Sequence, residues 1–325
     1  MTSAAGPEKP GAAPESSFAR DVREGLGGPG AKHLPPRYFY DDLGSILFDA
    51  ITRLPEYGIW RAEQGLLQAH AAAIARACPV QQVVELGSGS ASKTRLLLDA
   101  LLQAGPLAYC GIDISAGALA AAHGALGDLP GLAWRGIEAE YAAGLAAALQ
   151  GRRPHERVLV LFLGSSLGNF DPAEAHRLLA GVRATLRPGD ALLLGTDLVK
   201  PEPLLLAAYD DALGVTAAFN RNLLVRMNRE LDAAFMLPRF RHRVRFDQGT
   251  RNLEMHLESC QRQDVAIPGA GLVVRFDEGE TIHTESSHKY ELAEIDQLAT
   301  DTGFTVSARW VDDAWGFASN LFVVA

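Results

Sequence analysis

Short apolar runs that alternate with segments of helical spacing constrain the fold of this chain more than any other feature. The apolar runs occupy residues 82–86, 107–112, 132–135, 158–163 and 191–194. Segments with helical spacing follow them, near residues 93–103, 117–125, 142–149 and 172–186. Strands of a parallel sheet are buried on both faces and therefore lack the polar alternation of half-exposed strands. The pattern predicts an α/β fold with a doubly wound, Rossmann-like parallel sheet.

The pattern changes after residue 200. Residues 201–238 have mainly helical spacing, and apolar side chains then recur at every second position through 239–246 and 253–257. Together with another apolar run at 272–276, these segments predict an antiparallel meander inserted after the fifth strand. Residues 290–325 follow the order helix, strand, turn, strand, and we expect them to return to the main sheet.

The overall charge argues against some partners. The chain has 30 Lys and Arg against 39 Asp and Glu, a formal net charge of −9. A protein that coats nucleic acid or an anionic membrane is normally basic. Arg239, Arg241, Arg243 and Arg245 alternate with apolar residues, and we interpret them as the solvated face of a half-buried strand. We therefore expect neither nucleic acid nor a membrane as a partner.

The chain also lacks the usual signals of export. Residues 1–17 contain no apolar core of a signal peptide, and the longest apolar runs are too short to span a bilayer. Cys78, Cys110 and Cys260 are odd in number and far apart, which favours a reducing compartment. We expect a soluble, cytoplasmic protein that is a monomer.

A glycine turn after the first apolar run indicates a nucleotide-like cofactor. Gly87 and Gly89 follow this run, and Asp113 ends the next one. Such a turn lets a ligand approach the backbone, and the carboxylate can accept hydrogen bonds from two ribose hydroxyls. A dinucleotide-binding turn has a third glycine where this chain has Ser92. The acidic Glu85 suits a cationic ligand, so we favour S-adenosylmethionine (SAM), whose product is S-adenosylhomocysteine.

The loop after the fourth apolar run is a candidate substrate site. Residues 163–170 read Leu-Gly-Ser-Ser-Leu-Gly-Asn-Phe, and they would lie at the carboxyl edge of the sheet beside the cofactor. Small residues leave room for a small zwitterion. The Asn169 amide can donate to a carboxylate and accept from an amine.

At this point the chain resembles a known family, the histidine Nα-methyltransferases of ergothioneine biosynthesis. The similar motifs are Leu-Pro-Glu-Tyr at 54–57, the glycine turn with Lys-Thr-Arg at 93–95, the loop 164–169, and residues 194–200, 208–211, 214–216, 219–222 and 284–289. The resemblance runs from residue 18 to the C-terminus. It implies a class I SAM-dependent methyltransferase with an inserted α+β substrate-binding domain, and three methylations of the histidine α-amine to give hercynine.

The resemblance also implies roles for individual residues. It implies that Gly87, Lys93 and Asp113 hold the cofactor, and Glu138 is a displaced candidate near the adenine. The glycine turn itself adds Glu85 and Gly89 as cofactor candidates. The substrate pocket would contain Tyr57, Gly164, Asn169, Tyr209, Met255, Glu285 and Ser287, with Tyr40 nearby. Tyr40 and Asn169 are the candidates for catalytic roles.

The side chains that the resemblance assigns to the pocket can bind both the carboxylate and the ring of histidine. Asn169 and Tyr209 can bind the substrate carboxylate by neutral hydrogen bonds. Glu285 and Ser287 can bind the two imidazole nitrogens. The carboxylate prefers an N–H donor, so we expect it to select imidazole over indole or phenol. The chain departs from the family after Tyr57, where it continues with Gly-Ile-Trp at 58–60 in place of a Tyr-Pro-Thr-like stretch.

With these roles the chain divides into four predicted parts. They are a disordered tail at 1–17, an N-terminal helical segment at 18–60 that contributes to the substrate pocket, a methyltransferase core at 61–200 with 286–325, and the inserted substrate domain at 201–285.

Three other functions stay open at this point. The nearest is an Nα-methyltransferase for tryptophan or tyrosine, which would bring apolar or smaller residues to the positions of Met255 and Glu285. A nicotinamide-dependent oxidoreductase is disfavoured by Ser92. A binding protein without activity would bind SAM and methylate nothing. His283 and His288 have no third ligand in the sequence, so we expect no metal.

Overall fold

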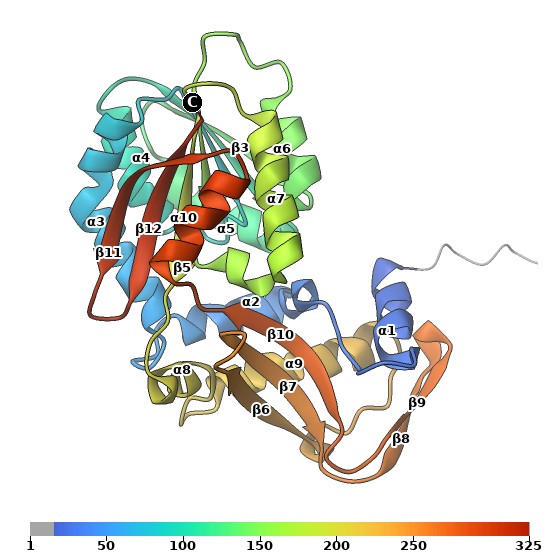
Figure 1. Ribbon diagram of the computed structural model, residues 1–325. Coiled ribbons are helices and arrows are strands. Elements are labelled where there is room, and N and C mark those ends of the chain that lie inside the picture. Colours follow the sequence, from blue (N-terminus) through green and yellow to red (C-terminus); the bar gives the residue numbers. More distant parts are fainter. Residues whose placement is uncertain (1–15, 325) are drawn as a thin grey trace, which may run out of the picture.

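A seven-stranded sheet with the order β11-β12-β5-β4-β1-β2-β3 forms the centre of the upper lobe in Figure 1. This computed structural model describes residues 16–324. The strands are β1 (Gln82–Leu86), β2 (Leu107–Asp113), β3 (Leu132–Glu138), β4 (Val158–Phe162), β5 (Ala191–Asp197), β11 (Thr305–Asp312) and β12 (Phe317–Val323). β1 to β5 run parallel, whereas β12 is antiparallel to β5 and to β11. The predicted α/β class with a doubly wound sheet is confirmed.

The order of the strands reverses at β1. The chain proceeds outward from β1 to β2 and β3, and then crosses back to β4 and β5 on the other side. Ligands of such sheets bind at the carboxyl ends of the strands next to this reversal. The glycine turn after β1 and the loop after β4 both lie at this place, because β1 and β4 are paired neighbours.

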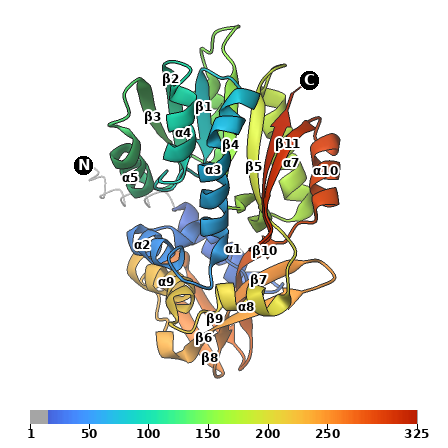
Figure 2. The same ribbon diagram turned by 90° about the vertical axis from the view of Figure 1, so that its left-hand side faces the viewer.

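Helices cover both faces of the sheet (Figure 2). One face carries α3 (Gly58–Ala77), α4 (Thr94–Leu102) and α5 (Ala116–Leu126), and the other carries α6 (Tyr141–Leu149), α7 (Pro172–Thr185) and α10 (Leu292–Asp301). Val83 packs on the face covered by α3, α4 and α5, and Val84 packs on the face covered by α6, α7 and α10. Every residue of β4 is buried, which explains its unbroken apolar sequence. Among residues 16–324, no helix is long and apolar enough to cross a membrane.

The lower lobe contains a second sheet. β6 (Phe240–Asp247), β7 (Asn252–Ser259) and β10 (Thr281–His288) form an antiparallel sheet in the order β10-β7-β6. The helices α8 (Glu202–Tyr209) and α9 (Val215–Glu230) pack against it. The N-terminal part of the chain joins this lobe in both views (Figures 1 and 2), with α2 (Asp42–Ile51) against α9 and α1 (Ser17–Gly27) against β9 (Leu272–Phe276). Within the described part of the chain there are also four short 3-10 helices: η1 (Pro36–Phe39), η2 (Ser166–Asn169), η3 (Leu237–Arg239) and η4 (Pro268–Ala270).

The prediction of the meander was wrong in its third strand. β9 (Leu272–Phe276) does not join β6 and β7 but pairs with β8 (Gln263–Ile267) in a separate two-stranded sheet. The third strand of the main antiparallel sheet is β10, which pairs with β7. β10 is rich in Thr, His, Glu and Ser, so it lacks the apolar alternation that identifies a half-buried strand.

Two predicted boundaries also differ from the structure. The proposed end of the inserted domain, between residues 285 and 286, falls inside β10, whose pairing with β7 continues to His288. The predicted tail overlaps α1, because the Ser16 side chain accepts a hydrogen bond from the backbone N–H of Ala19 and so caps a helix that begins at Ser17. Residues 1–15, which contain the rest of the predicted tail, lie outside the described residues.

Gly58, where the chain departs from the family pattern, packs directly against Trp315. A Cβ atom at Gly58 would lie 2.2 Å from two atoms of the indole ring. Trp315 has little freedom to move, because its indole N–H donates to Asp197 Oδ1 at 3.0 Å. We therefore expect Gly58→Ala to lower the free energy of unfolding by about 1–3 kcal/mol, the usual cost of overpacking. Urea unfolding followed by tryptophan fluorescence measures this loss.

Gly65→Ala is the matched control for this substitution. Gly65 lies in the same helix, and a Cβ atom there would meet no atom within 4 Å. We expect it to stabilise the protein by about 0.5–1 kcal/mol, since alanine favours a helix interior over glycine. Equal stability of the two variants would contradict the packing argument.

Candidate active site

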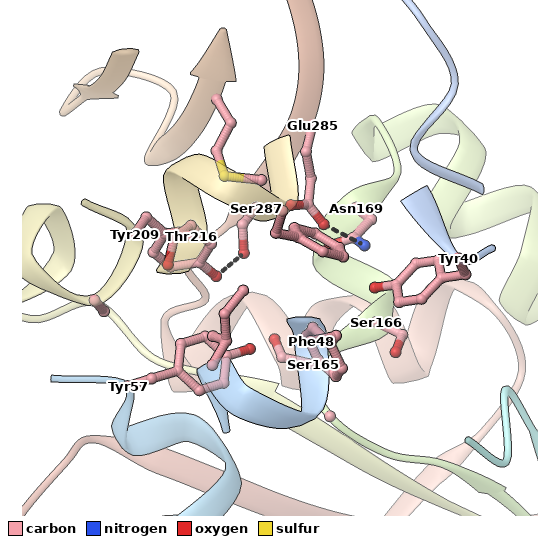
Figure 3. A pocket seen from close by; sticks show the side chains of 15 residues that line it. Tyr40, Phe48, Tyr57, Ser165, Ser166, Asn169, Tyr209, Thr216, Glu285 and Ser287 are labelled. Carbon is pink, nitrogen blue, oxygen red and sulfur yellow. Dashed lines mark hydrogen bonds between the residues drawn. The ribbon is translucent and has the colours of Figure 1, made fainter. Parts of the chain in front are cut away.

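A pocket lies between the loop that follows β4 and the second sheet (Figure 3). Its lining comes from both lobes and from the N-terminal segment. The lining residues are Tyr40, Phe48, Ile51, Tyr57, Gly164, Ser165, Ser166, Asn169, Ala208, Tyr209, Thr216, Phe219, Met255, Glu285 and Ser287. All the positions predicted for the substrate pocket, from Tyr40 to Ser287, are among them. Segments up to 247 residues apart in the sequence therefore meet in one cavity.

The loop after β4 is held in an unusual conformation. Gly164 and Ser165 both have positive φ angles, 74° and 59°. The Ser165 hydroxyl accepts a hydrogen bond from the backbone N–H of Asp197 at 2.9 Å, which ties the loop to β5. A Cβ atom at Gly168 would lie 2.9 Å from the backbone carbonyl of His288 in β10. The glycines thus allow the loop to lie directly against the second sheet.

Asn169 and Glu285 meet across this contact. The Asn169 amide donates to Glu285 Oε1 at 3.1 Å (Figure 3). Glu285 lies at an irregularity in the pairing of β10 with β7, where the register shifts between His283 and Glu285. Such bulges redirect side chains. Burial raises the pKa of the Glu285 carboxyl to about 7, against the opposing effects of Lys289 and Asn169. Met255 is the partner of Glu285 on β7.

Tyr209 and Ser287 form a second polar pair in the pocket. The Tyr209 hydroxyl donates to Ser287 Oγ at 2.9 Å, and both residues are buried (Figure 3). Ser287 lies two residues beyond Glu285 on the same strand, so both side chains point to the same face of β10. The pocket therefore presents a carboxylate and a hydroxyl side by side.

Aromatic rings form the remaining wall of the pocket. Tyr40 makes edge contacts with Phe48 and Phe219, with ring centroids 5.7 and 5.8 Å apart, and Tyr57 packs on Tyr209 at 6.1 Å. Burial raises the pKa values of Tyr40 and Tyr57 well above their ordinary value, and Glu285 adds to the effect in both cases. Both phenols are therefore neutral at physiological pH.

The glycine turn after β1 is shaped to receive a ligand. Gly87 and Gly89 have φ angles of 70° and 50°, a conformation that favours glycine. A Cβ atom at Gly89 would meet no protein atom within 4 Å, and one at Gly87 would approach the Tyr141 hydroxyl at 3.2 Å. Asp113 anchors the turn, because its two oxygens accept from the backbone N–H groups of Gly89 and Ser115, both at 3.0 Å. This open cradle beside a carboxylate fits a nucleoside.

Lys93 lies next to the turn but is paired inside the protein. Its ammonium group contacts the carboxylate of Glu63, whose side chain has no exposed surface. The same carboxylate accepts from the backbone N–H of Gly164, with both oxygens 2.9 Å from the nitrogen. Glu63 thereby connects the loop of the substrate pocket to the predicted cofactor site. The Lys93 side chain remains 14% exposed, so a predicted contact with the cofactor is compatible with this pairing.

The remaining two predicted cofactor residues differ in environment. Glu138 is exposed at the end of β3, where it pairs in register with Asp113 at the same sheet edge. Glu85 is only 3% exposed, and its carboxylate accepts from the hydroxyls of Thr94 and Tyr109 at 2.7 and 2.6 Å. The structure therefore surrounds Glu85 with protein donors, whereas Glu138 faces solvent.

The burial of Glu85 predicts a specific dependence of stability on pH. Desolvation raises its pKa from 4.5 to about 7, despite the two hydroxyl donors. A raised value in the folded state means that the stabilising contribution is complete below pH 4.5 and is lost as the pH rises through 7. We expect Glu85→Gln to remove this loss. Relative to wild type, the variant should gain about 3 kcal/mol of unfolding free energy between pH 4 and pH 8.

Urea unfolding of both proteins at several pH values measures this gain. Glu278→Gln is the control, because it makes the same change at an exposed position. A difference between Glu85→Gln and wild type that stays constant from pH 4 to pH 8 would show that folding does not raise the pKa of Glu85.

Sequence reasoning missed seven residues of the pocket. They are Phe48, Ile51, Ser165, Ser166, Ala208, Thr216 and Phe219. Ser165, Ser166, Ala208, Thr216 and Phe219 belong to motifs that carry the family resemblance, so a signal for them was present. Phe48 and Ile51 show only the helical spacing of any amphipathic helix. Among residues 16–324, no group of His, Cys, Asp and Glu is arranged to hold a metal ion.

Comparison with known proteins gives matches along nearly the whole chain. The model of a family described as "Histidine-specific methyltransferase, SAM-dependent" matches residues 18–324. A histidine N-alpha-methyltransferase of Mycolicibacterium smegmatis is 43% identical over 309 residues, which cover 94% of this chain and 95% of that protein. One of Mycobacterium tuberculosis is 41% identical over 307 residues, 94% of each chain. Among solved structures, a SAM-dependent methyltransferase of Clostridium acetobutylicum matches with a TM-score of 0.44 at 11% identity, over 81% of this chain and 91% of that one.

Proposed function

Because the chain belongs to the family of SAM-dependent, histidine-specific methyltransferases, we propose that it transfers three methyl groups to the α-amine of L-histidine. The product is hercynine, and the reaction is the first step of ergothioneine biosynthesis. The resemblance of the motifs and the identity to two histidine N-alpha-methyltransferases, over more than nine-tenths of the chain, support this function.

One observation carries the proposal within the structure. The Asn169–Glu285 and Tyr209–Ser287 pairs lie in the same pocket, and the loop that provides Asn169 is joined through Glu63 to the glycine turn. A small amino acid in this pocket would therefore lie next to the cofactor site.

The cradle at the glycine turn provides the groups that SAM requires. We assign Asp113 to the ribose hydroxyls, with Gly87 and Gly89 giving the ligand access to the backbone. We assign Lys93, which is paired with Glu63 and partly exposed, to the carboxylate of the amino-acid end of SAM. Glu138, in register with Asp113, is assigned to the adenine. When bound, SAM supplies an electrophilic methyl group on its sulfonium.

The pocket residues would bind both ends of histidine. Asn169 and Tyr209 are assigned to the substrate carboxylate, and Glu285 and Ser287 to the two ring nitrogens. The Tyr209 hydroxyl donates to Ser287 in the structure, and it would exchange this bond for one to the substrate carboxylate. A ring N–H satisfies Glu285, while a side chain without such a donor leaves the buried carboxylate unpaired, at a cost of a few kcal/mol.

Positioning accounts for most of the rate in this proposal. The reaction needs an unprotonated amine on line with the methyl group, and fixing that geometry can lower the barrier by several kcal/mol. Tyr40 and Tyr57 are neutral phenols beside the pocket, so they act as hydrogen-bond partners rather than as phenolate bases. We assign Tyr40 and Asn169 to orienting the amine.

The direct test is to incubate the purified protein with histidine and excess SAM, and to count the products. We expect one hercynine and three S-adenosylhomocysteine molecules for each histidine consumed. Asn169→Ala should retain S-adenosylhomocysteine binding and lose histidine binding. Methyl groups on a ring nitrogen, in place of the α-amine, would contradict the assigned orientation of the substrate.

A further inference from the structure

Lys289 has no role in the function proposed so far, although its ammonium group lies directly behind the pocket. Its side chain has no exposed surface. The ammonium donates to Ser287 Oγ at 2.8 Å and to the Tyr209 hydroxyl at 3.1 Å. It also lies 3.0 Å from Asp197 Oδ2. A lysine ammonium has three donors and no acceptor, so these three oxygens account for all of its polar contacts.

The charges around Lys289 leave it without a counter-ion of its own. Asp197 is the carboxylate in contact with it, and Asp197 is also paired with the buried Lys200. Trp315 donates to the same carboxylate at 3.0 Å. Two buried lysines therefore share the Asp197 carboxylate as their contacting counter-ion. A buried charge of this kind is costly unless a partner compensates it.

The two hydroxyls in contact with Lys289 lead into the pocket. Each hydroxyl oxygen accepts from the ammonium, so it must use its own proton to donate. The Tyr209 proton goes to Ser287 in the free pocket. Ser287 accepts from both Lys289 and Tyr209, and no residue within 16–324 accepts its proton. That proton is therefore available to an acceptor in the pocket.

We propose that Lys289 is a positioning residue that makes Tyr209 and Ser287 hydrogen-bond donors toward the substrate, and that its charge compensates the substrate carboxylate through Tyr209. Resting on the proposed function, this assigns Tyr209 to the carboxylate and Ser287 to the unprotonated ring nitrogen. The ionised Glu285 carboxylate carries no hydrogen, so it accepts a hydrogen bond from the other ring nitrogen. The pocket thus selects the neutral imidazole ring.

Other charged and titratable groups around the pocket do not replace Lys289. Glu285 on β10 is an acid, as is Glu63 on α3, and Tyr40, Tyr57 and Tyr209 are neutral phenols. Lys200 is the second cation nearby, and it is held by Asp197 and the Trp315 ring, 4.5 Å from the ring centroid. Lys289 also lowers the pKa of Glu285, in opposition to burial.

Lys289→Met tests the proposal, because it removes the charge and leaves Asp197 paired with Lys200 alone. Calorimetric titration of histidine into protein saturated with S-adenosylhomocysteine gives the Kd. We expect a rise of about 10- to 100-fold, the usual effect of losing a charge-assisted hydrogen bond. The Kd of S-adenosylhomocysteine should stay within about threefold of wild type, since Lys289 makes no contact with the glycine turn. Lys289→Gln serves as the second variant if the methionine variant does not fold.

Two comparisons distinguish a positioning role of Lys289 from a purely structural one. Histamine lacks the carboxylate, so its Kd should rise less than that of histidine in Lys289→Met. In the Tyr209→Phe/Ser287→Ala background, Lys289→Met should add less than about threefold, because the groups through which it acts are absent. Equal losses for both ligands, or the same loss in both backgrounds, would overturn the proposal. Wild-type protein that binds S-adenosylhomocysteine but not histidine would instead overturn the function on which it rests.

Discussion

Asp113→Ala should weaken the binding of S-adenosylhomocysteine by at least about 100-fold. The carboxylate is assigned to the two ribose hydroxyls, and a hydrogen bond to a charged group contributes about 1.5–3 kcal/mol. The substitution also removes the acceptors that hold the backbone N–H groups of Gly89 and Ser115, so the glycine turn loses its anchor. The lost hydrogen bonds and the loosened turn both weaken the binding of S-adenosylhomocysteine. Calorimetric titration with S-adenosylhomocysteine measures the loss.

Asp128→Ala is the matched control for this prediction. Asp128 is an exposed aspartate that pairs with Arg95 on the surface, so its removal should leave the Kd unchanged. Binding by Asp113→Ala within about threefold of wild type would contradict the cofactor site at the carboxyl ends of β1 and β2.

Glu285→Gln should lower kcat/KM for histidine by about 100-fold and leave the binding of S-adenosylhomocysteine intact. Glutamine has nearly the same shape and can accept from Asn169 through its oxygen. Its NH2 group then faces the ring N–H of histidine, so two donors meet where an acceptor is required. A buried donor left without a partner costs about 1–3 kcal/mol, and the lost charge adds to this. Steady-state kinetics with histidine at saturating SAM measures the change.

The pH profile separates this effect from a general disturbance of the pocket. The Glu285 carboxyl, with a pKa of about 7 in the free pocket, is an acceptor on both oxygens only when it is ionised. Its contribution to kcat/KM therefore increases as the pH rises through 7, and Glu285→Gln should lack this increase. Glu278→Gln, at an exposed site, should match wild type. If Glu285→Gln kept both the rate and the pH profile, Glu285 would not bind the ring.

The parallel strands of the main sheet could be predicted because they are buried on both faces and are therefore made of apolar residues. β4 is buried along its whole length and is apolar along its whole length. β10 shows why a strand of the second sheet could not be predicted in the same way. Glu285 and Ser287 are polar because they line the pocket, and the Thr284 hydroxyl donates to Asn220 Oδ1. The strand that carries much of the candidate site therefore has no apolar pattern.

The interaction partners of the site residues could not be predicted from the sequence either. The family motifs place Glu285, Ser287 and Asn169 in one pocket, and all three line it. The contact of Lys93 with Glu63, a residue 30 positions earlier in the chain, depends on how α3 crosses the sheet. The hydroxyls around Glu85 come from the neighbouring strand and helix. Local sequence contains no information on such contacts, whereas the type of residue at each position is enough to suggest its chemistry.

One measurement tests the central claim most directly. The purified protein is incubated with SAM and an equimolar pool of all amino acids, and the products are identified by mass spectrometry. We predict that histidine gains up to three methyl groups on its α-amine while the other amino acids remain unmodified. Methylation of tryptophan or tyrosine in place of histidine would contradict the selection by Glu285, and an absence of methylation despite SAM binding would contradict the activity itself.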